Sequence, residues 1–142
     1  MTNDEVRAFL SRFGTAWKEQ DLVTLAESYN DDCEVVSPMF HTLRGFPQVE
    51  ASFRDLFRAF STESLRVDEV IIDSDTGVRA AVVWTAKVKH QGEIFGTPAT
   101  GKSFEMTMAL IITLVNGRIA REVRLYDFTR LLLQLGVLRA RA

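Results

Sequence analysis

The stretch from Asn116 to Gly136 reads NGRIAREVRLYDFTRLLLQLG and carries the features from which we infer the fold. Asn116-Gly117 is a strong β-hairpin signal, because a two-residue type I′ turn needs positive φ at both central positions. The residues that follow alternate in polarity, which predicts a strand over 118–128. One face of that strand would carry Ile119, Val123, Leu125 and Asp127. We therefore expect the Asp127 carboxylate to point into an apolar interior.

Further strands are expected before this segment. The period-2 pattern predicts them at about 65–73, 78–90 and 103–115, with a turn at Asp75-Thr76-Gly77. Joined through Asn116-Gly117 to the last strand, they predict a long antiparallel meander.

The N-terminal part has helical spacing instead. A Thr2-x-x-Glu5 capping box precedes apolar residues three and four apart, namely Val6, Phe9, Leu10, Phe13 and Trp17. Asp21 can cap a second, short helix that includes Tyr29 and ends near Asp31, before a strand at 33–37. Gly45 and Pro47 open a third helix whose apolar stripe is Val49, Phe53, Leu56, Phe57 and Phe60.

Helices first and strands afterwards predict an α+β domain. We expect a cone-shaped, curved antiparallel or mixed sheet wrapped around three N-terminal helices, with a short C-terminal helix. From the length of 142 residues we expect one domain, 1–142. The open end of such a cone is a natural pocket.

Composition excludes several classes of function. Charged residues make up 25% and the net charge is -2, which does not suggest a nucleic-acid partner. The sequence has no signal-peptide pattern and no apolar run of membrane-spanning length, so we expect a cytoplasmic protein. One cysteine and two histidines do not readily assemble a histidine/cysteine zinc cluster, so no metal is predicted.

Asp127 and His90 are the candidate catalytic residues. His90 shares the Trp84 face of the strand 78–90, so both groups would point into the cavity. An aspartate in an apolar cavity becomes a stronger base, because desolvation raises its pKa. Two alternatives remain open: Asp127 could cap the C-terminal helix or pair with an arginine, and His90 could be a solvated loop residue.

Aromatic residues would line the pocket. The candidates are Phe13, Trp17, Tyr29, Phe53, Phe57 and Trp84. Such a lining suits a flat, apolar ligand, although large aromatic residues also serve as ordinary core.

Three segments carry a family resemblance: WKEQDLVTLAESYNDDCEVVSP, HQGEIFGTPATGKSF and NGRIAREVRLYDFTRLLLQLG. They resemble the SnoaL-like polyketide cyclases, a family of the nuclear transport factor two and ketosteroid isomerase superfamily. The most specific matches are the Gly-x-x-x-Thr-Gly-Lys stretch at 96–102 and the arrangement of Asp127, Gln134, Leu135 and Gly136. The resemblance implies a cofactor-independent intramolecular aldol condensation in which the residue matching Asp127 is the base.

The chain departs from these enzymes at several positions. Where the cyclases place a histidine and other polar partners, this chain has Ile111 and Thr113. Ketosteroid isomerases have an aspartate before a proline where Ser37-Pro38 stands, and a tyrosine near Phe13. The strand 78–90 lacks the acids that limonene epoxide hydrolases need.

Two functions therefore remain. The first is an enzyme in which Asp127 removes a proton from an apolar, polyketide-like or other cyclic carbonyl compound while His90 positions or polarises the carbonyl. Tyr29 or Trp84 could assist His90. The second is a non-catalytic small-molecule binder or dimerisation module, in which Asp127 only ties the last strand to the C-terminal helix. Whether Asp127 lines the cavity distinguishes them. In either case the apolar outer sheet face predicts a homodimer through Val83, Ala109, Ile111 and Val115.

Overall fold

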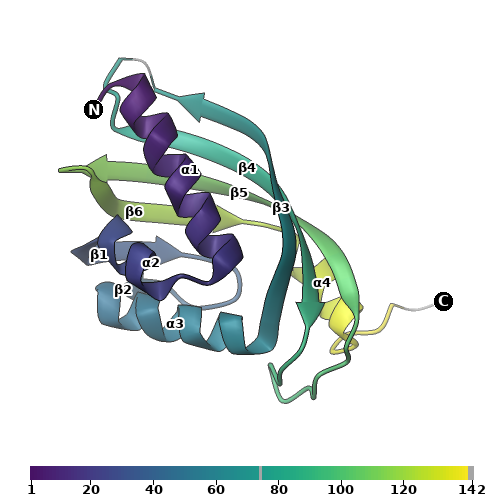
Figure 1. Cartoon of the computed structure of the whole chain (residues 1–142). Helices are drawn as coiled ribbons and strands as arrows, with labels where there is room; N and C mark the ends of the chain where they lie inside the picture. Colours follow the sequence, from purple (N-terminus) through teal and green to yellow (C-terminus); the bar gives the residue numbers. More distant parts are fainter. Residues whose placement is uncertain (74, 141–142) are drawn as a thin grey trace.

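A curved six-stranded sheet wraps around three helices in the computed structural model, which describes residues 1–73 and 75–140 (Figure 1). The strands are β1 (Tyr29–Val36), β2 (Leu43–Arg44), β3 (Phe60–Ile72), β4 (Arg79–His90), β5 (Ser103–Val115) and β6 (Arg118–Leu125). Their order across the sheet is β2-β1-β6-β5-β4-β3. β1 and β6 pair in parallel and the other pairs are antiparallel, so the predicted α+β cone with a mixed sheet is confirmed.

Three helices lie against the concave side of the sheet and a fourth lies beyond the last strand (Figure 1). They are α1 (Asn3–Glu19), α2 (Leu22–Ser28), α3 (Phe46–Ala59) and α4 (Phe128–Leu135). The apolar stripe of α1 is buried, with Val6 and Phe13 completely enclosed. Two leucines of α4, Leu131 and Leu135, pack with Ala59 and Phe60 where α3 runs into β3.

The local signals in the sequence act as expected. Thr2 and Glu5 form the reciprocal capping box, and the Asp21 side chain caps α2 by accepting from the Thr24 N–H. Asn116 and Gly117 have φ of 53° and 76°, the positive values that the β5–β6 hairpin turn requires. The capping box, the Asp21 cap and the hairpin are confirmed.

Two expected helix ends are wrong by a few residues. Tyr29 begins β1 instead of lying within the second helix, and Phe60 begins β3 instead of lying within the third helix. In both places an aromatic residue continues the helical spacing, but it is already in extended backbone as the helix C-cap. Aromatic residues favour strands, and pairing within the sheet determines their conformation here.

A β-bulge in β6 reverses the predicted face of the residues that follow it. Leu114 pairs with Ile119 while Thr113 pairs with Arg121, so Ala120 is an extra residue in β6. Such an insertion exchanges inward and outward side chains beyond it. Consequently Glu122 and Arg124 are buried at 0% and 2% exposure, whereas Leu125 is 50% exposed.

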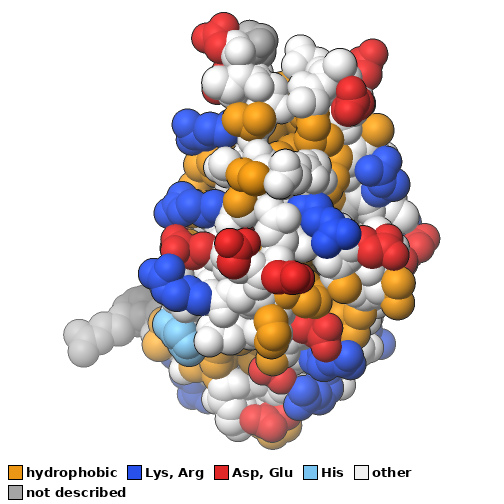
Figure 2. All heavy atoms as spheres, turned by 90° about the vertical axis from the view of Figure 1, so that its left-hand side faces the viewer, with side chains coloured by type: hydrophobic (Ala, Val, Ile, Leu, Met, Phe, Trp, Pro, Cys, Tyr) orange, Lys and Arg blue, Asp and Glu red, His pale blue; other side chains and the backbone are white. Residues whose placement is uncertain are grey.

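Figure 2 shows acidic and basic side chains interspersed with apolar ones on one face of the molecule. On the sheet, Val83, Ala109 and Ile111 are half-buried and Val115 is 49% exposed. Within residues 1–73 and 75–140, no helix has the length and apolar character needed to span a bilayer.

Candidate functional site

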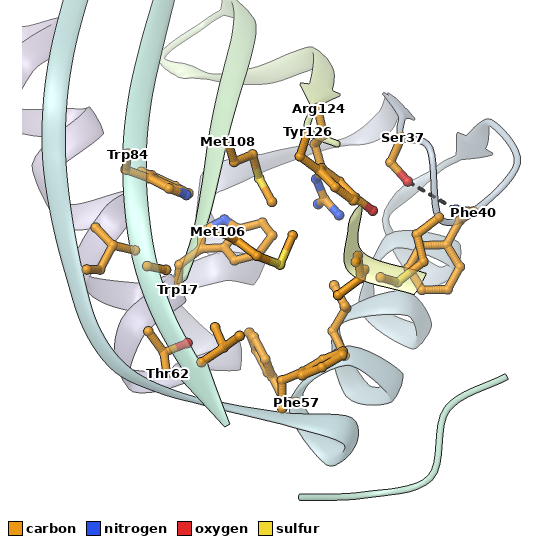
Figure 3. Close-up of a pocket in the computed structure, with 17 residues that line it drawn as sticks. Trp17, Ser37, Phe40, Phe57, Thr62, Trp84, Met106, Met108, Arg124 and Tyr126 are labelled. Atoms are coloured by element: carbon orange, nitrogen blue, oxygen red, sulfur yellow. Dashed lines mark hydrogen bonds between the residues drawn. The ribbon is translucent and has the colours of Figure 1, made fainter. Parts of the chain in front are cut away.

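A largely apolar cavity of about 90 Å³ lies between the concave face of the sheet and the ends of α1, α3 and α4 (Figure 3). Its apolar lining is Trp17, Met39, Phe40, Leu56, Phe57, Phe60, Leu65, Trp84, Ala86, Val88, Met106, Met108 and Leu131. Its polar lining is Ser37, Thr62, Arg124 and Tyr126. An apolar cavity of about 150 Å³ takes a benzene molecule, so this one suits a small ligand or part of a larger one. Methionine side chains adapt in shape, and three of them line the cavity.

The aromatic residues predicted to line the pocket divide into two groups. Trp17, Phe57 and Trp84 line the cavity. The others, Phe13, Tyr29 and Phe53, are fully enclosed in the core beside it. The rings form one continuous cluster, since Phe53 packs edge-on against Trp17 with centroids 5.1 Å apart. Phe13, Tyr29 and Phe53 therefore support the cavity wall without forming it.

Behind this wall lies a buried charge network. Arg124 donates through Nε to Oε2 of Glu122, and the Tyr29 hydroxyl donates to Oε1 of the same carboxylate. Nη2 of Arg124 lies 3.5 Å from the Tyr29 hydroxyl oxygen. All three side chains are at most 2% exposed, so the ion pair is shielded from water. Among them only Arg124 lines the cavity.

Aromatic rings hold the Arg124 guanidinium in place. Its central carbon lies 4.9 Å from the ring centroid of Trp17 and 5.0 Å from that of Phe53. Each distance lies within the range of a cation–π interaction, which gains strength when the cation is desolvated. Figure 3 shows the guanidinium directed into the space between Trp17, Met108 and Tyr126.

Burial shifts the ionisation of these groups. Burial alone would lower the pKa of Arg124, but the adjacent Glu122 carboxylate outweighs it and the pKa stays above its usual value. Burial and the same carboxylate raise the pKa of the Tyr29 hydroxyl well above its ordinary value. Burial raises the pKa of Tyr126 to about 12. Arg124 is therefore a permanent cation and both tyrosines are neutral hydrogen-bond donors at neutral pH.

Asp127 does not point into the cavity, so this part of the sequence interpretation is wrong. It is exposed, and its Oδ1 accepts from the Arg130 N–H at 2.9 Å as the N-cap of α4. The bulge at Ala120 explains the difference, because it turns the odd-numbered side chains that follow it outward. Asp127 borders a separate surface cleft, on the other side of Met106 and Leu131 from the cavity.

His90 faces inward, as the alternation in β4 predicts, and is completely buried. Its Nδ1 lies 3.0 Å from the Thr100 hydroxyl and accepts from the Thr100 N–H at 3.2 Å. The His90 carbonyl accepts from the Gly101 N–H, where φ is 70°. The Thr-Gly-Lys stretch thus fastens the 91–102 loop onto His90. His90 does not line the cavity, and its Nε2 has no hydrogen-bond partner among the described residues.

Sequence interpretation missed the polar groups that do reach the cavity. Uninterrupted alternation over the predicted strand 118–128 places Glu122, Arg124 and Tyr126 on the face opposite to Asp127, away from the interior. The spacing Glu-x-Arg-x-Tyr in the last strand was a usable signal, because buried charges occur in pairs and alternate residues share a face. The position of the bulge was required to choose between the two faces.

The cavity offers hydrogen-bond donors and one cation. Arg124 and Tyr126 contribute donors, and the Trp17 Nε1–H is buried with no partner among the described residues. The described lining contains no aspartate, glutamate or histidine. Across residues 1–73 and 75–140, no three acidic, histidine or cysteine side chains are grouped so as to hold a metal ion. This arrangement can bind and polarise an acceptor oxygen, while a base would have to come from elsewhere.

Solved structures with the same fold come from several bacteria. TsrD from Streptomyces laurentii is 24% identical, with a TM-score of 0.80 over 97% of this chain and 99% of that one. AclR from Streptomyces galilaeus is 20% identical, with a TM-score of 0.80 over 100% of this chain and 87% of that one. A Catenulispora acidiphila protein with a ketosteroid isomerase-like fold, solved with trimethylamine, is 14% identical, with a TM-score of 0.73 over 96% and 95%. At these identities the similarity shows the fold alone.

The family is shown by sequence. No curated protein matches the chain. The family model described as SnoaL-like polyketide cyclase matches residues 7–135, which include every helix and strand from most of α1 to the end of α4. The chain therefore belongs to the SnoaL-like polyketide cyclase family.

Proposed function

We propose that this protein binds a small, largely apolar molecule in the cavity and holds an acceptor oxygen of that molecule with Arg124. The observation that carries the proposal is a buried guanidinium lining a largely apolar cavity. A buried cation is costly unless it is compensated. Glu122 compensates this one, and Trp17 and Phe53 hold it on the cavity wall, where it can donate to a ligand. Apolar walls with a few convergent polar groups are typical of small-molecule sites.

Binding has more direct support than proton abstraction. Arg124 can polarise a carbonyl and so acidify the neighbouring C–H, which is the first requirement of cyclase-type chemistry. The second requirement, a base within reach of that proton, has no candidate among the described lining residues. A base role for Asp127, with His90 assisting, stays a prediction from the family resemblance. It would require the carboxylate to leave the Arg130 N–H and pass Met106 and Leu131.

A ligand-retention experiment tests the proposal. Purified protein is incubated with a bacterial extract, separated by gel filtration and examined by native mass spectrometry. The matched control is Ala86→Phe, because Ala86 lines the cavity and a phenyl group there would fill it. We expect the wild-type chain to retain a small molecule that a folded Ala86→Phe variant does not. Equal retention by both proteins would refute binding in this cavity.

We also propose that the protein acts as a homodimer assembled through the outer face of the sheet. Val83, Ala109, Ile111 and Val115 lie on that face, and none of them is fully buried in the single chain. An apolar patch on the open face of a sheet favours contact with another protein surface, here a second copy of the chain.

A further inference from the structure

We infer that Glu122, which does not line the cavity, determines the charge of the ligand that the cavity accepts. It neutralises Arg124, so the cavity selects an uncharged acceptor oxygen and excludes a carboxylate. This inference rests on the proposed function and specifies the ligand of that same site.

Paired with Glu122, Arg124 presents no net charge to the cavity. Its Nε is committed to Glu122, whose second oxygen is committed to the Tyr29 hydroxyl. Glu122 is 0% exposed and Arg124 is 2% exposed, so neither charge is screened by water. Seen from the cavity, the pair is a dipole with its guanidinium end forward, not a free cation.

A bound carboxylate would upset this balance. It would bring a second negative charge close to a guanidinium that already compensates Glu122. In this water-poor cavity the ligand carboxylate would lose its hydration without gaining a cation of its own, because Arg124 is already paired with Glu122. An uncharged carbonyl loses much less hydration, and it can still accept a charge-assisted hydrogen bond from Arg124.

The rest of the lining agrees with a neutral acceptor. The other donors are uncharged at neutral pH, since burial raises the pKa of Tyr126 to about 12 and the Trp17 indole does not ionise. The Trp17 Nε1–H is buried and has no hydrogen-bond partner among the described residues. A carbonyl oxygen has two lone pairs, so it can accept from the guanidinium and from a second donor of this kind.

The test uses acetophenone, benzoate and ethylbenzene, which are similar in size and differ in the polar group. The chain has two tryptophans, Trp17 and Trp84, and both line the cavity. Their indole N–H signals in ¹⁵N-labelled protein therefore report directly on occupancy, and titrations give the dissociation constants. At neutral pH we expect the wild-type chain to bind acetophenone about tenfold more tightly than either benzoate or ethylbenzene.

Three variants separate a role in selectivity from a role in folding alone. Glu122→Gln should raise benzoate affinity about tenfold and change acetophenone affinity much less, because Arg124 then carries an uncompensated charge. Glu122→Gln/Arg124→Gln removes both charges and should lose that gain. The control Glu63→Gln makes the same change in net charge at an exposed site and should keep the wild-type preference.

Two results would overturn the inference and leave the binding proposal intact. One is a wild-type preference for benzoate over acetophenone. The other is a folded Glu122→Gln variant that keeps the wild-type preference. If Glu122→Gln does not fold, the wild-type ratio still tests the inference. If none of the three compounds moves either indole signal, the proposed function fails and the inference fails with it.

Discussion

Arg124 donates to Glu122 two residues earlier on the same strand, and both side chains are buried on the concave side of the sheet. Residues two apart in a strand share a face, so the pair forms within β6 without help from another element. Tyr29 on the adjacent strand β1 completes the network. The pair thus joins the core to the cavity.

Removing one member of the ion pair should be far more harmful than removing both. Arg124→Met leaves the Glu122 carboxylate buried and uncompensated, so we expect a loss of about 3–5 kcal/mol in unfolding free energy. Glu122→Leu/Arg124→Met should recover most of that loss. Urea denaturation of the two variants measures the difference. Equal destabilisation by both would show that the shape of the side chains, not their charge, controls stability here.

Asp127 should behave as a helix cap. Asp127→Ala removes the acceptor for the Arg130 N–H, so unfolding free energy should fall by roughly 0.5–2 kcal/mol. Asp127→Asn should stay close to wild type, because asparagine caps helices about as well as aspartate.

Asp127→Asn also tests the base role that the family resemblance implies. Once a substrate is known, this variant should turn it over as the wild-type chain does if Asp127 is only a cap. Loss of turnover in a variant with an unchanged melting temperature would instead restore Asp127 as the catalytic base.

Stability should decrease at high pH. The pKa of Tyr126 is raised from 10.0 to about 12 by burial, so the folded state keeps a proton that the unfolded state loses. Its stabilising contribution is complete below the unfolded value and is lost as pH rises toward the folded value. Tyr126→Phe should therefore show a shallower fall in melting temperature between pH 10 and about 12. Superimposable curves would mean that Tyr126 does not contribute.

A second buried group also titrates at high pH, so its variant serves as the reference for Tyr126→Phe. The buried Cys33 thiol, with its pKa raised to about 11 by burial, contributes a similar fall beginning at lower pH. Cys33→Ala should flatten the earlier part of the curve, and Tyr126→Phe the later part.

The outer sheet face should hold two copies together. Light scattering of the wild-type chain should give a dimer at micromolar concentration, and Ile111→Lys should give a monomer with unchanged secondary structure. The half-buried Ile111 lies near the middle of β5, so a charge there would be trapped in the interface. A wild-type monomer would show that this face tolerates water.

The sequence by itself determined the features that depend on neighbouring residues. The Thr2–Glu5 capping box, the Asp21 cap and the Asn116-Gly117 turn each require only a few adjacent side chains or φ values. The order of the helices and of the longer strands followed from the period of the apolar residues, and with the family resemblance this was enough for the curved α+β fold. The two-residue strand β2 was not predicted.

Only the tertiary structure decided which residues form the site. Ala120 is an extra residue in β6, and this one insertion turned Glu122 and Arg124 inward and Asp127 outward. The alternation of polar and apolar residues in the sequence does not reveal a bulge. The extra residue becomes visible only when the pairing of β6 with β5 is known. For the same reason Phe13, Tyr29 and Phe53 could be predicted to face inward, but whether each reached the cavity depended on how α1, α3 and the sheet pack together.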